Sequence, residues 1–210
     1  HESGHAFGAD DYYTYDNKDW GPMGGTDMMD YNIGDHNAYT KGIFGWADPI
    51  VVTGEATVKV KSFTDTGEAI VLPAYREDGE VSNTLLDNYI MIEYYRPTGL
   101  NERDATYNYS GNYPKMPDIP GIRVYHVDSR LGLFTYGQTS GWQFVRYVST
   151  VTATDSNSYI DIANSNTKSR SADPDNRLLH VLEVSGQNTL KNSTFTTRYS
   201  SSMMWQEGDT

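Results

Sequence analysis

The spacing of two histidines at the start of the chain constrains its local structure more than any other feature. His1 and His5 are four residues apart, and an α-helix with 3.6 residues per turn places such residues on one face. Two imidazoles so placed can bind one zinc ion. Glu2 completes an H-E-x-x-H arrangement, in which the carboxylate can accept the proton of a metal-activated water. The segment therefore predicts a helix that carries a zinc site and a general base.

The residues after His5 extend this pattern. Gly8 can adopt the left-handed backbone conformation that ends a helix and redirects the chain, and Asp11 follows three residues later. The resulting H-E-x-x-H-x-x-G-x-x-D resembles the metzincin spacing, with aspartate in place of the third histidine. Because a carboxylate oxygen is an acceptable zinc ligand, we predict that Asp11 is the third ligand.

Three other residues stay open as the third ligand, and we rank them behind Asp11: Asp10, Asp30 and His36. Asp30 falls one position late for the G-T-x-x-D pattern of deuterolysin-like peptidases. Thermolysin-like peptidases take a glutamate from a later helix. That class fits poorly, because the first glutamate after Glu2 is Glu55, in a segment with strand character.

A glycine-rich turn with several methionines follows at residues 22–31, PMGGTDMMDY. It resembles the methionine turn that lies beneath the zinc in metzincins, where the flexible thioether fills the space under the ligands. Tyr31 stands two residues after Met29. A tyrosine so placed can hydrogen-bond the oxyanion of a tetrahedral intermediate, so Tyr31 is a candidate catalytic residue, with packing as the alternative role.

Composition limits the classes of function. The chain has 210 residues, a formal net charge of −12 and no cysteine, which is long enough for one substantial domain or two small ones. The negative charge argues against nucleic acid and anionic membrane surfaces as partners, because both would repel it. The lack of cysteine excludes disulfide and thiol chemistry. The sequence has no visible signal peptide and no run suited to membrane insertion.

Downstream of residue 34 the pattern predicts one short helix and then strands. Asp35 is a suitable N-cap for a helix over residues 35–46. Runs of β-branched and aromatic residues, separated by turn residues, predict strands at residues 50–52, 56–62, 69–72, 88–95, 122–128, 142–148 and 178–184. The run at 56–62 alternates valine with lysine, as expected of a half-solvated antiparallel strand.

These elements predict an α+β fold. Its first part is the C-terminal half of a metzincin-like zincin catalytic domain, with the active-site helix, the methionine turn and a short helix. A mostly antiparallel β-rich region follows. A soft division separates a zinc-site segment at residues 1–46 from residues 47–210, which form the β-rich part of the same or an adjoining domain.

Several polar groups have structural interpretations. Glu93 and Arg96 are expected to form an ion pair, and His126 and Asp128, two apart on a strand, a hydrogen-bonded pair. Oxygen-rich clusters at residues 155–157 and 173–176 offer ligands of the type that calcium takes, and turn formation explains them equally well. The serines at 200–202 are expected to be mobile.

Five segments, in chain order, resemble the immune inhibitor A family of secreted bacterial metallopeptidases: HESGHAFGADDYY, PMGGTDMMDY, GDHNAYTKGIFGW, IMIEYYR and PGIRVYHVD. The resemblance covers residues 1 to 130, with a further match in HVLEVSG at 180–186. It implies an exported zinc endopeptidase that acts on proteins or peptides, with structural calcium in some members. His1 and His5 would be ligands, Glu2 the base and Asp11 the candidate third ligand.

The family's catalytic domain begins well before the zinc helix. We therefore expect the N-terminal half of the domain to be missing from this chain, together with the edge strand that holds substrate by backbone pairing. On that expectation the chain alone has little or no peptidase activity. The alternative function is a non-catalytic module whose β-rich part presents tyrosine-rich surfaces to glycan or protein, with a vestigial metal motif.

Overall fold

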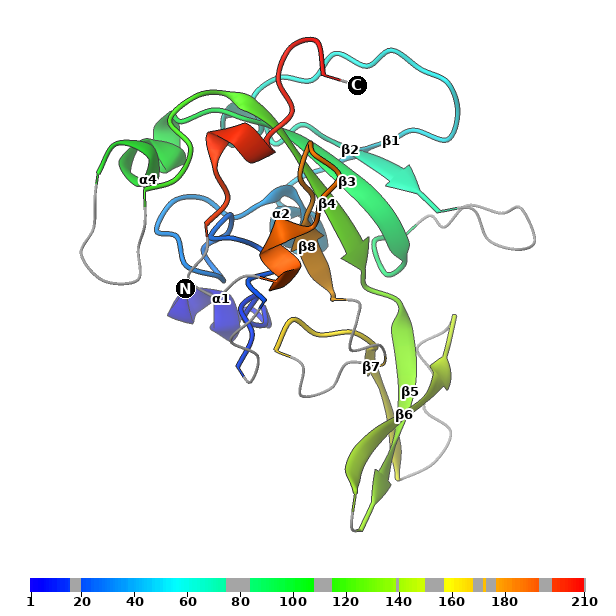
Figure 1. Ribbon diagram of the computed structural model, residues 1–210. Helices are drawn as coiled ribbons and strands as arrows, with labels where there is room; N and C mark the ends of the chain where they lie inside the picture. The colour runs from blue at the N-terminus through cyan, green and yellow to red at the C-terminus, as the bar shows by residue number, and fades with distance from the viewer. Residues whose placement is uncertain are drawn as a thin grey trace.

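The structure, a computed structural model, describes residues 1–15, 20–74, 84–107, 115–138, 140–149, 157–167, 172, 177–192 and 198–209. Over these residues the chain has a mixed α+β fold with short helices and mostly antiparallel strands (Figure 1). The predicted α+β class is therefore confirmed. The helices are α1 (Glu2–Ala6), α2 (Ala38–Ile43), α3 (Phe63–Thr66) and α4 (Glu102–Thr106), and the 3-10 turns are η1 (Gly99–Asn101), η2 (Thr189–Asn192) and η3 (Ser201–Met203).

A five-stranded sheet forms the body of the molecule. Its strands, in spatial order, are β1 (Ile50–Val51), β2 (Ala69–Pro73), β3 (Asn88–Tyr95), β4 (Gly121–Asp128) and β8 (Leu179–Val181). β1 runs parallel to β2, and the other neighbours are antiparallel. Side chains of β3 alternate between buried and half-buried positions, because successive residues of a strand point to opposite faces.

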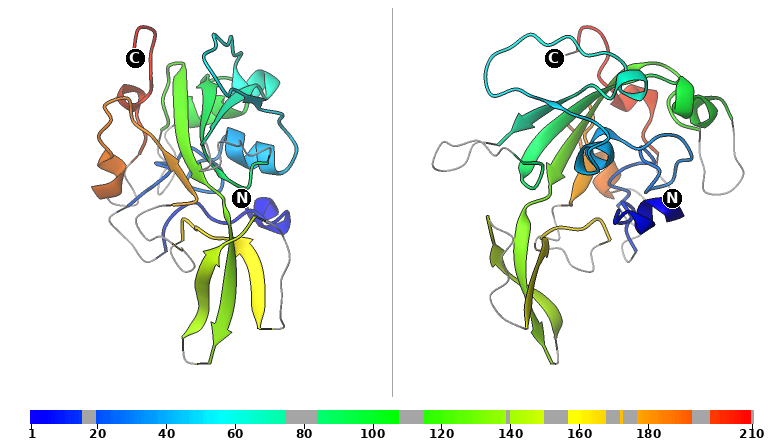
Figure 2. Two further views of the ribbon diagram at one scale, coloured as in Figure 1. Left: turned by 90° about the vertical axis from the view of Figure 1, so that its right-hand side faces the viewer. Right: turned by 180° about the vertical axis from the view of Figure 1, so that it is seen from behind.

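A three-stranded sheet extends from one end of this body (Figures 1 and 2). It contains β5 (Leu131–Gly137), β6 (Gly141–Tyr147) and β7 (Ser158–Ile162), with β5 in the middle. Only Ser129 and Arg130 separate β4 from β5, so the chain passes almost directly from the large sheet into the small one. The sequence pattern predicted a strand at 142–148, close to β6, but neither β5 nor β7.

The hydrophobic core lies between the large sheet and the N-terminal segment with α1 and α2 (Figure 2). Tyr39 of α2 packs with Met91 of β3, Val127 of β4 and Leu179 of β8 in one buried cluster. This core takes residues from both sides of the soft division at residue 46. Segments far apart in the chain therefore support the region around α1.

A buried carboxylate joins α2 to the sheet. Glu93 accepts hydrogen bonds from the backbone N–H of Ala38, at 2.9 Å, and from the Tyr125 hydroxyl, at 2.8 Å. The Arg123 guanidinium lies 3.6 Å from it. The expected Glu93–Arg96 pair is therefore wrong. Residues three apart in a strand point to opposite faces, and Arg96 instead lies 3.7 Å from Asp65.

The helix at 35–46 is shorter than predicted. Asn37, and not Asp35, caps it by accepting a hydrogen bond from the Thr40 N–H. Asp35 instead pairs with Lys41 at 2.6 Å. The difference arises because the chain still follows the preceding turn at Asp35, so helical geometry begins only after Asn37.

The strand predicted at 56–62 is absent. Val58 and Val60 are half-buried while Lys59 and Lys61 are exposed, so the alternation holds. Only Ser62 bridges to a neighbouring strand residue, Tyr94. An alternating pattern becomes a strand only when another strand supplies hydrogen-bond partners along its length.

The side chains of the expected His126–Asp128 pair each have another partner. His126 lies 3.0 Å from Asn88, and Asp128 pairs with Arg130 at 2.6 Å. Asp128 ends β4, where the chain turns toward β5. Near the C-terminus, Ser201 and Ser202 belong to η3, and Trp205 bridges to Ile122, which ties this segment to the sheet.

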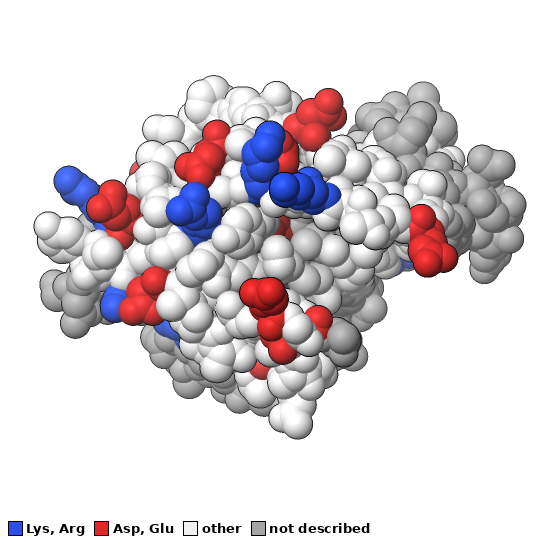
Figure 3. Space-filling view, turned by 90° about the horizontal axis from the view of Figure 1, so that it is seen from above, with Lys and Arg blue, Asp and Glu red and all other residues white. Residues whose placement is uncertain are grey.

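Basic and acidic side chains are interspersed on the face seen from above (Figure 3). Lys or Arg lies beside Asp or Glu there, and no broad patch of one sign covers that face. None of the helices in the described part of the chain combines the length and apolar character needed to cross a bilayer.

Candidate metal centre

The predicted helix and turn bring the two histidines and one aspartate together. α1 spans Glu2–Ala6, with His1 as its N-cap. Gly8 follows with a φ of +97°, a conformation that strains residues with a Cβ. The chain reverses there, and the Ala9 N–H bonds back to the Gly4 carbonyl at 3.0 Å. This reversal returns Asp11 to the face of α1 that carries His1 and His5.

The three side chains converge on one point. Asp11 Oδ1 lies 3.0 Å from His1 Nε2 and 3.3 Å from His5 Nε2. The two imidazole rings are perpendicular, with centroids 4.9 Å apart. One ligand atom from each residue lies within 4.8 Å of the others. Among the described residues this is the one group of three or more such side chains with metal-site spacing.

Hydrogen bonds on the far side of each imidazole fix its orientation. His1 Nδ1 donates to the Met28 carbonyl at 2.7 Å, and His5 Nδ1 donates to the Ala9 carbonyl at 2.8 Å. In a neutral imidazole the other nitrogen then carries a lone pair. Both Nε2 atoms therefore face Asp11 as acceptors, the arrangement found around metal-bound histidines.

Asp11 supplies an acceptor that has no hydrogen bond. Its Oδ1 atom is buried and accepts none, and the residue is only 6% exposed. A buried carboxylate oxygen left unpaired costs free energy. A cation between the three acceptors removes that cost, so the residues present fit a divalent metal. Two imidazoles and one carboxylate form a donor set that zinc takes, with a fourth position open.

Two tyrosines contact the Asp11 carboxylate. The Tyr15 hydroxyl donates to Asp11 Oδ2, and the Tyr13 side chain is also hydrogen-bonded to Asp11. The hydrogen bond to Asp11, together with burial, raises the pKa of Tyr15 to about 12. Burial and the Asp11 charge raise the pKa of Tyr13 above its usual range. Both phenols keep their protons at neutral pH and act as donors.

The methionine-rich turn lies under α1. Met29 is fully buried, and a Cβ at Gly4 would overlap its sulfur. Asp27 orders the turn from within. It accepts hydrogen bonds from the backbone N–H of Met29 at 2.7 Å and of Asn37 at 2.6 Å, and from the Thr40 hydroxyl at 3.0 Å. The turn thereby presents the Met28 carbonyl to His1.

An open pocket of about 430 Å³ adjoins His1 and Glu2. Tyr31 and Asp30 also line it, and Glu2 is exposed at its edge. The Tyr31 ring lies 5.0 Å from that of Tyr13, centroid to centroid. Burial raises the pKa of Asp30 to about 7, against the lowering effects of the Gly25 N–H and the Arg198 charge. Both predicted catalytic residues, Glu2 and Tyr31, therefore border one cavity beside the metal ligands.

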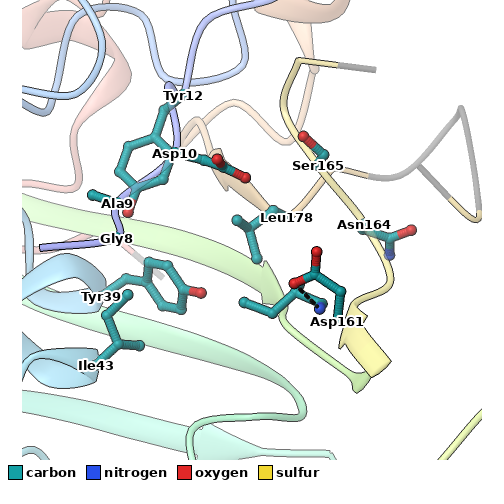
Figure 4. Close-up of a pocket in the computed structure, with 11 residues that line it drawn as sticks. Gly8, Ala9, Asp10, Tyr12, Tyr39, Ile43, Asp161, Asn164, Ser165 and Leu178 are labelled. Atoms are coloured by element: carbon teal, nitrogen blue, oxygen red, sulfur yellow. Dashed lines mark hydrogen bonds between the residues drawn. The ribbon is translucent and has the colours of Figure 1, made fainter. Parts of the chain in front are cut away.

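The other candidates for the third ligand have different surroundings. Asp30 accepts a hydrogen bond from the Gly25 N–H at 2.6 Å, and His36 lies 3.4 Å from Asp27. Asp10 lines a separate pocket of about 270 Å³, where its carboxylate and that of Asp161 point into the cavity (Figure 4). The structure brings Asp11, and none of these three, to the histidines.

Sequence reasoning missed four groups that support the site: Asp27, the Met28 carbonyl, Tyr13 and Tyr15. Tyr13 and Tyr15 stand two and four residues after Asp11, and tyrosines so close to a predicted carboxylate ligand were a usable signal. The proposed calcium clusters lie mainly outside the described residues, at 155–156 and 173–176, and only Asn157 of them is described.

Comparison with protein-family models, with curated proteins and with solved structures found no match to this chain.

Proposed function

We propose that the chain carries the zinc-binding part of a metallopeptidase that hydrolyses peptide bonds in protein or peptide substrates. The observation that carries this proposal is the convergence of three acceptor atoms, His1 Nε2, His5 Nε2 and Asp11 Oδ1. The buried Oδ1 without a hydrogen bond gives these atoms a reason to bind a cation.

A zinc ion at these ligands would polarise the substrate carbonyl and lower the pKa of a water molecule. Glu2 borders the same pocket as His1 and is exposed, so its carboxylate is free to accept the proton of the attacking water and return it to the leaving amine. Tyr31 also lines this pocket, and its hydroxyl would donate a hydrogen bond to the oxyanion.

The exposure of the site suits a large substrate. The side chains of His1 and His5 are 28% and 36% exposed, whereas Asp11 is 6% exposed. The ligands are therefore anchored on the buried side and open on the other, where a polypeptide can approach. The sequence resemblance to the immune inhibitor A family supports the same proposal, including the metzincin-like half-domain, secretion from a bacterium and structural calcium.

The test is a pair of measurements on the full-length protein, because this chain alone is expected to have little or no peptidase activity. We expect one zinc ion per chain by elemental analysis, and loss of that zinc in His5→Ala. Cleavage of casein should depend on zinc and be lost in Glu2→Gln while zinc content is retained, because Glu2 is a base and not a ligand. Glu55→Gln, an exposed glutamate outside the site, is the matched control. Unchanged turnover in zinc-loaded Glu2→Gln would refute the assigned base.

A second candidate function rests on the small sheet. Tyr136, Trp142 and Tyr147 on β5 and β6 are between 37% and 55% exposed, and rings of this kind stack on sugars and on protein surfaces. In this alternative the chain is a binding module with a vestigial metal motif. Absence of both zinc and peptidase activity from the full-length protein would favour it.

A further inference from the structure

Two tyrosines contact the carboxylate of Asp11. The Tyr15 hydroxyl donates to Oδ2, and Tyr13 is hydrogen-bonded to the same carboxylate. The other oxygen, Oδ1, faces His1 and His5. The two oxygens of one carboxylate therefore have separate partners.

The rings of the tyrosines also contact each other and a ligand. The Tyr13 ring lies nearly parallel to that of His1, at 14°, with centroids 6.3 Å apart. The Tyr13 and Tyr15 rings have centroids 5.6 Å apart. Tyr13 thus touches two of the three ligands, and Tyr15 reinforces it from outside. Tyr15 is 63% exposed, so its hydroxyl can be removed without disturbing the core.

Each of the three ligands is held by a hydrogen bond on the side that faces away from the metal site. In each histidine the Nδ1–H group, which faces away from the metal site, donates a hydrogen bond to a backbone carbonyl and so fixes the orientation of the ring. An aspartate has no N–H with which to do this, so its non-ligating oxygen must receive a hydrogen bond from a donor elsewhere. Tyr13 and Tyr15 supply such donors. Without them the carboxylate could rotate and bind the metal through both oxygens, which would crowd the open fourth position.

We propose that Tyr13 and Tyr15 are positioning residues that hold Asp11 as a one-oxygen metal ligand. This inference rests on the proposed function, because it concerns the same metal centre. Groups that hydrogen-bond metal ligands from outside typically change metal affinity by about 10- to 100-fold when removed. Their effect is therefore measurable in metal binding itself, without reference to catalysis.

The test compares Tyr15→Phe and Tyr13→Phe/Tyr15→Phe with the wild-type protein. Both substitutions keep the rings and remove only the hydroxyls. Tyr136→Phe is the control, because Tyr136 is an exposed tyrosine on β5. Zinc affinity is measured by competition with a chromogenic chelator. Cobalt(II) is then added in place of zinc, because its visible absorption reports the number of ligand atoms.

We expect the double variant to bind zinc about 10- to 100-fold more weakly, with Tyr15→Phe intermediate and Tyr136→Phe unchanged. The cobalt absorption of the double variant should weaken as Asp11 adds its second oxygen. Circular dichroism of the metal-free variants should match that of the wild type, which separates an effect on the ligand from a loss of folding.

The outcomes separate the two proposals. Wild-type zinc affinity and an unchanged cobalt spectrum in the double variant would overturn the positioning role and leave the peptidase proposal standing. Tyrosine-dependent zinc binding without any peptidase activity in the full-length protein would support the positioning role and refute the enzymatic function. A wild-type protein that binds no zinc would overturn both.

Discussion

Gly4, in the middle of α1, packs directly on the sulfur of Met29, which is fully buried in the turn below. This contact fixes how closely α1 approaches the turn. The same turn presents the Met28 carbonyl, which receives the hydrogen bond from His1 Nδ1. Helix position and ligand orientation are therefore coupled through one close approach.

Gly4→Ala should displace α1, because the added methyl group overlaps the Met29 sulfur. Overpacking of this kind costs about 1–3 kcal/mol, and we expect weaker zinc binding along with the lower free energy of unfolding. Gly54→Ala is the control, since a Cβ there meets no atom within 4 Å. Denaturant unfolding and chelator competition measure both quantities. Equal values for the two variants would contradict the packing argument.

Tyr31→Phe should slow peptide hydrolysis by the full-length protein without changing its zinc content. Loss of one oxyanion donor typically lowers kcat on the order of 100-fold or more, whereas the ring would keep its contact with Tyr13. Steady-state kinetics on a fluorogenic peptide provide the measurement. Tyr107→Phe, an exposed tyrosine that follows α4, is the control. If Tyr31→Phe keeps full kcat, Tyr31 packs in the pocket without a catalytic role.

Glu93→Gln should destabilise the fold strongly. The substitution leaves Arg123 buried without its charge partner, and breaking a buried pair in this way costs about 3–5 kcal/mol. Glu68→Gln removes one partner of the exposed Lys61–Glu68 pair, and little change is expected because solvent screens that pair. Urea unfolding measures the free energy of unfolding of both variants. Similar stability of the two variants would show that Glu93 contributes no more than a surface charge.

Acid should weaken the fold through His180. Burial lowers the pKa of His180 to about 4, with smaller contributions from His126 and Lys191. The pKa of a histidine in an unfolded chain is about 6.5. Between the two pKa values the unfolded chain therefore binds more protons than the folded protein. The free energy of unfolding therefore falls as pH drops from 6.5 toward 4, by up to about 3 kcal/mol.

The ring centroids of His180 and Trp20 are 5.9 Å apart. His180→Phe keeps an aromatic ring against Trp20 and removes the titrating group. The variant should show a shallower decline in stability across this pH range, measured by urea unfolding at several pH values. Burial also lowers the pKa of His126, so part of the decline should persist. Parallel pH curves for the variant and the wild type would rule out His180 as a source of the acid sensitivity.

Local patterns in the sequence were enough to predict several elements. The four-residue spacing of His1 and His5 predicted α1, and Gly8 was expected to end it, as its φ of +97° confirms. The run of β-branched and aromatic residues at 88–95 matches β3 to the residue. These predictions succeed because helix periodicity, strand propensity and glycine's conformational freedom are properties of neighbouring residues.

The sequence by itself therefore determined the α+β class, the helix with its two histidines and a short set of candidate third ligands. The structure brings to the histidines Asp11, the candidate that its local spacing ranked first. Tertiary structure alone brought the Met28 carbonyl to His1. It also decided that residues 56–62 have no partner strand and that Glu93 pairs with Arg123. The reason is physical: each of these outcomes depends on distances between segments far apart along the chain, which no local pattern encodes.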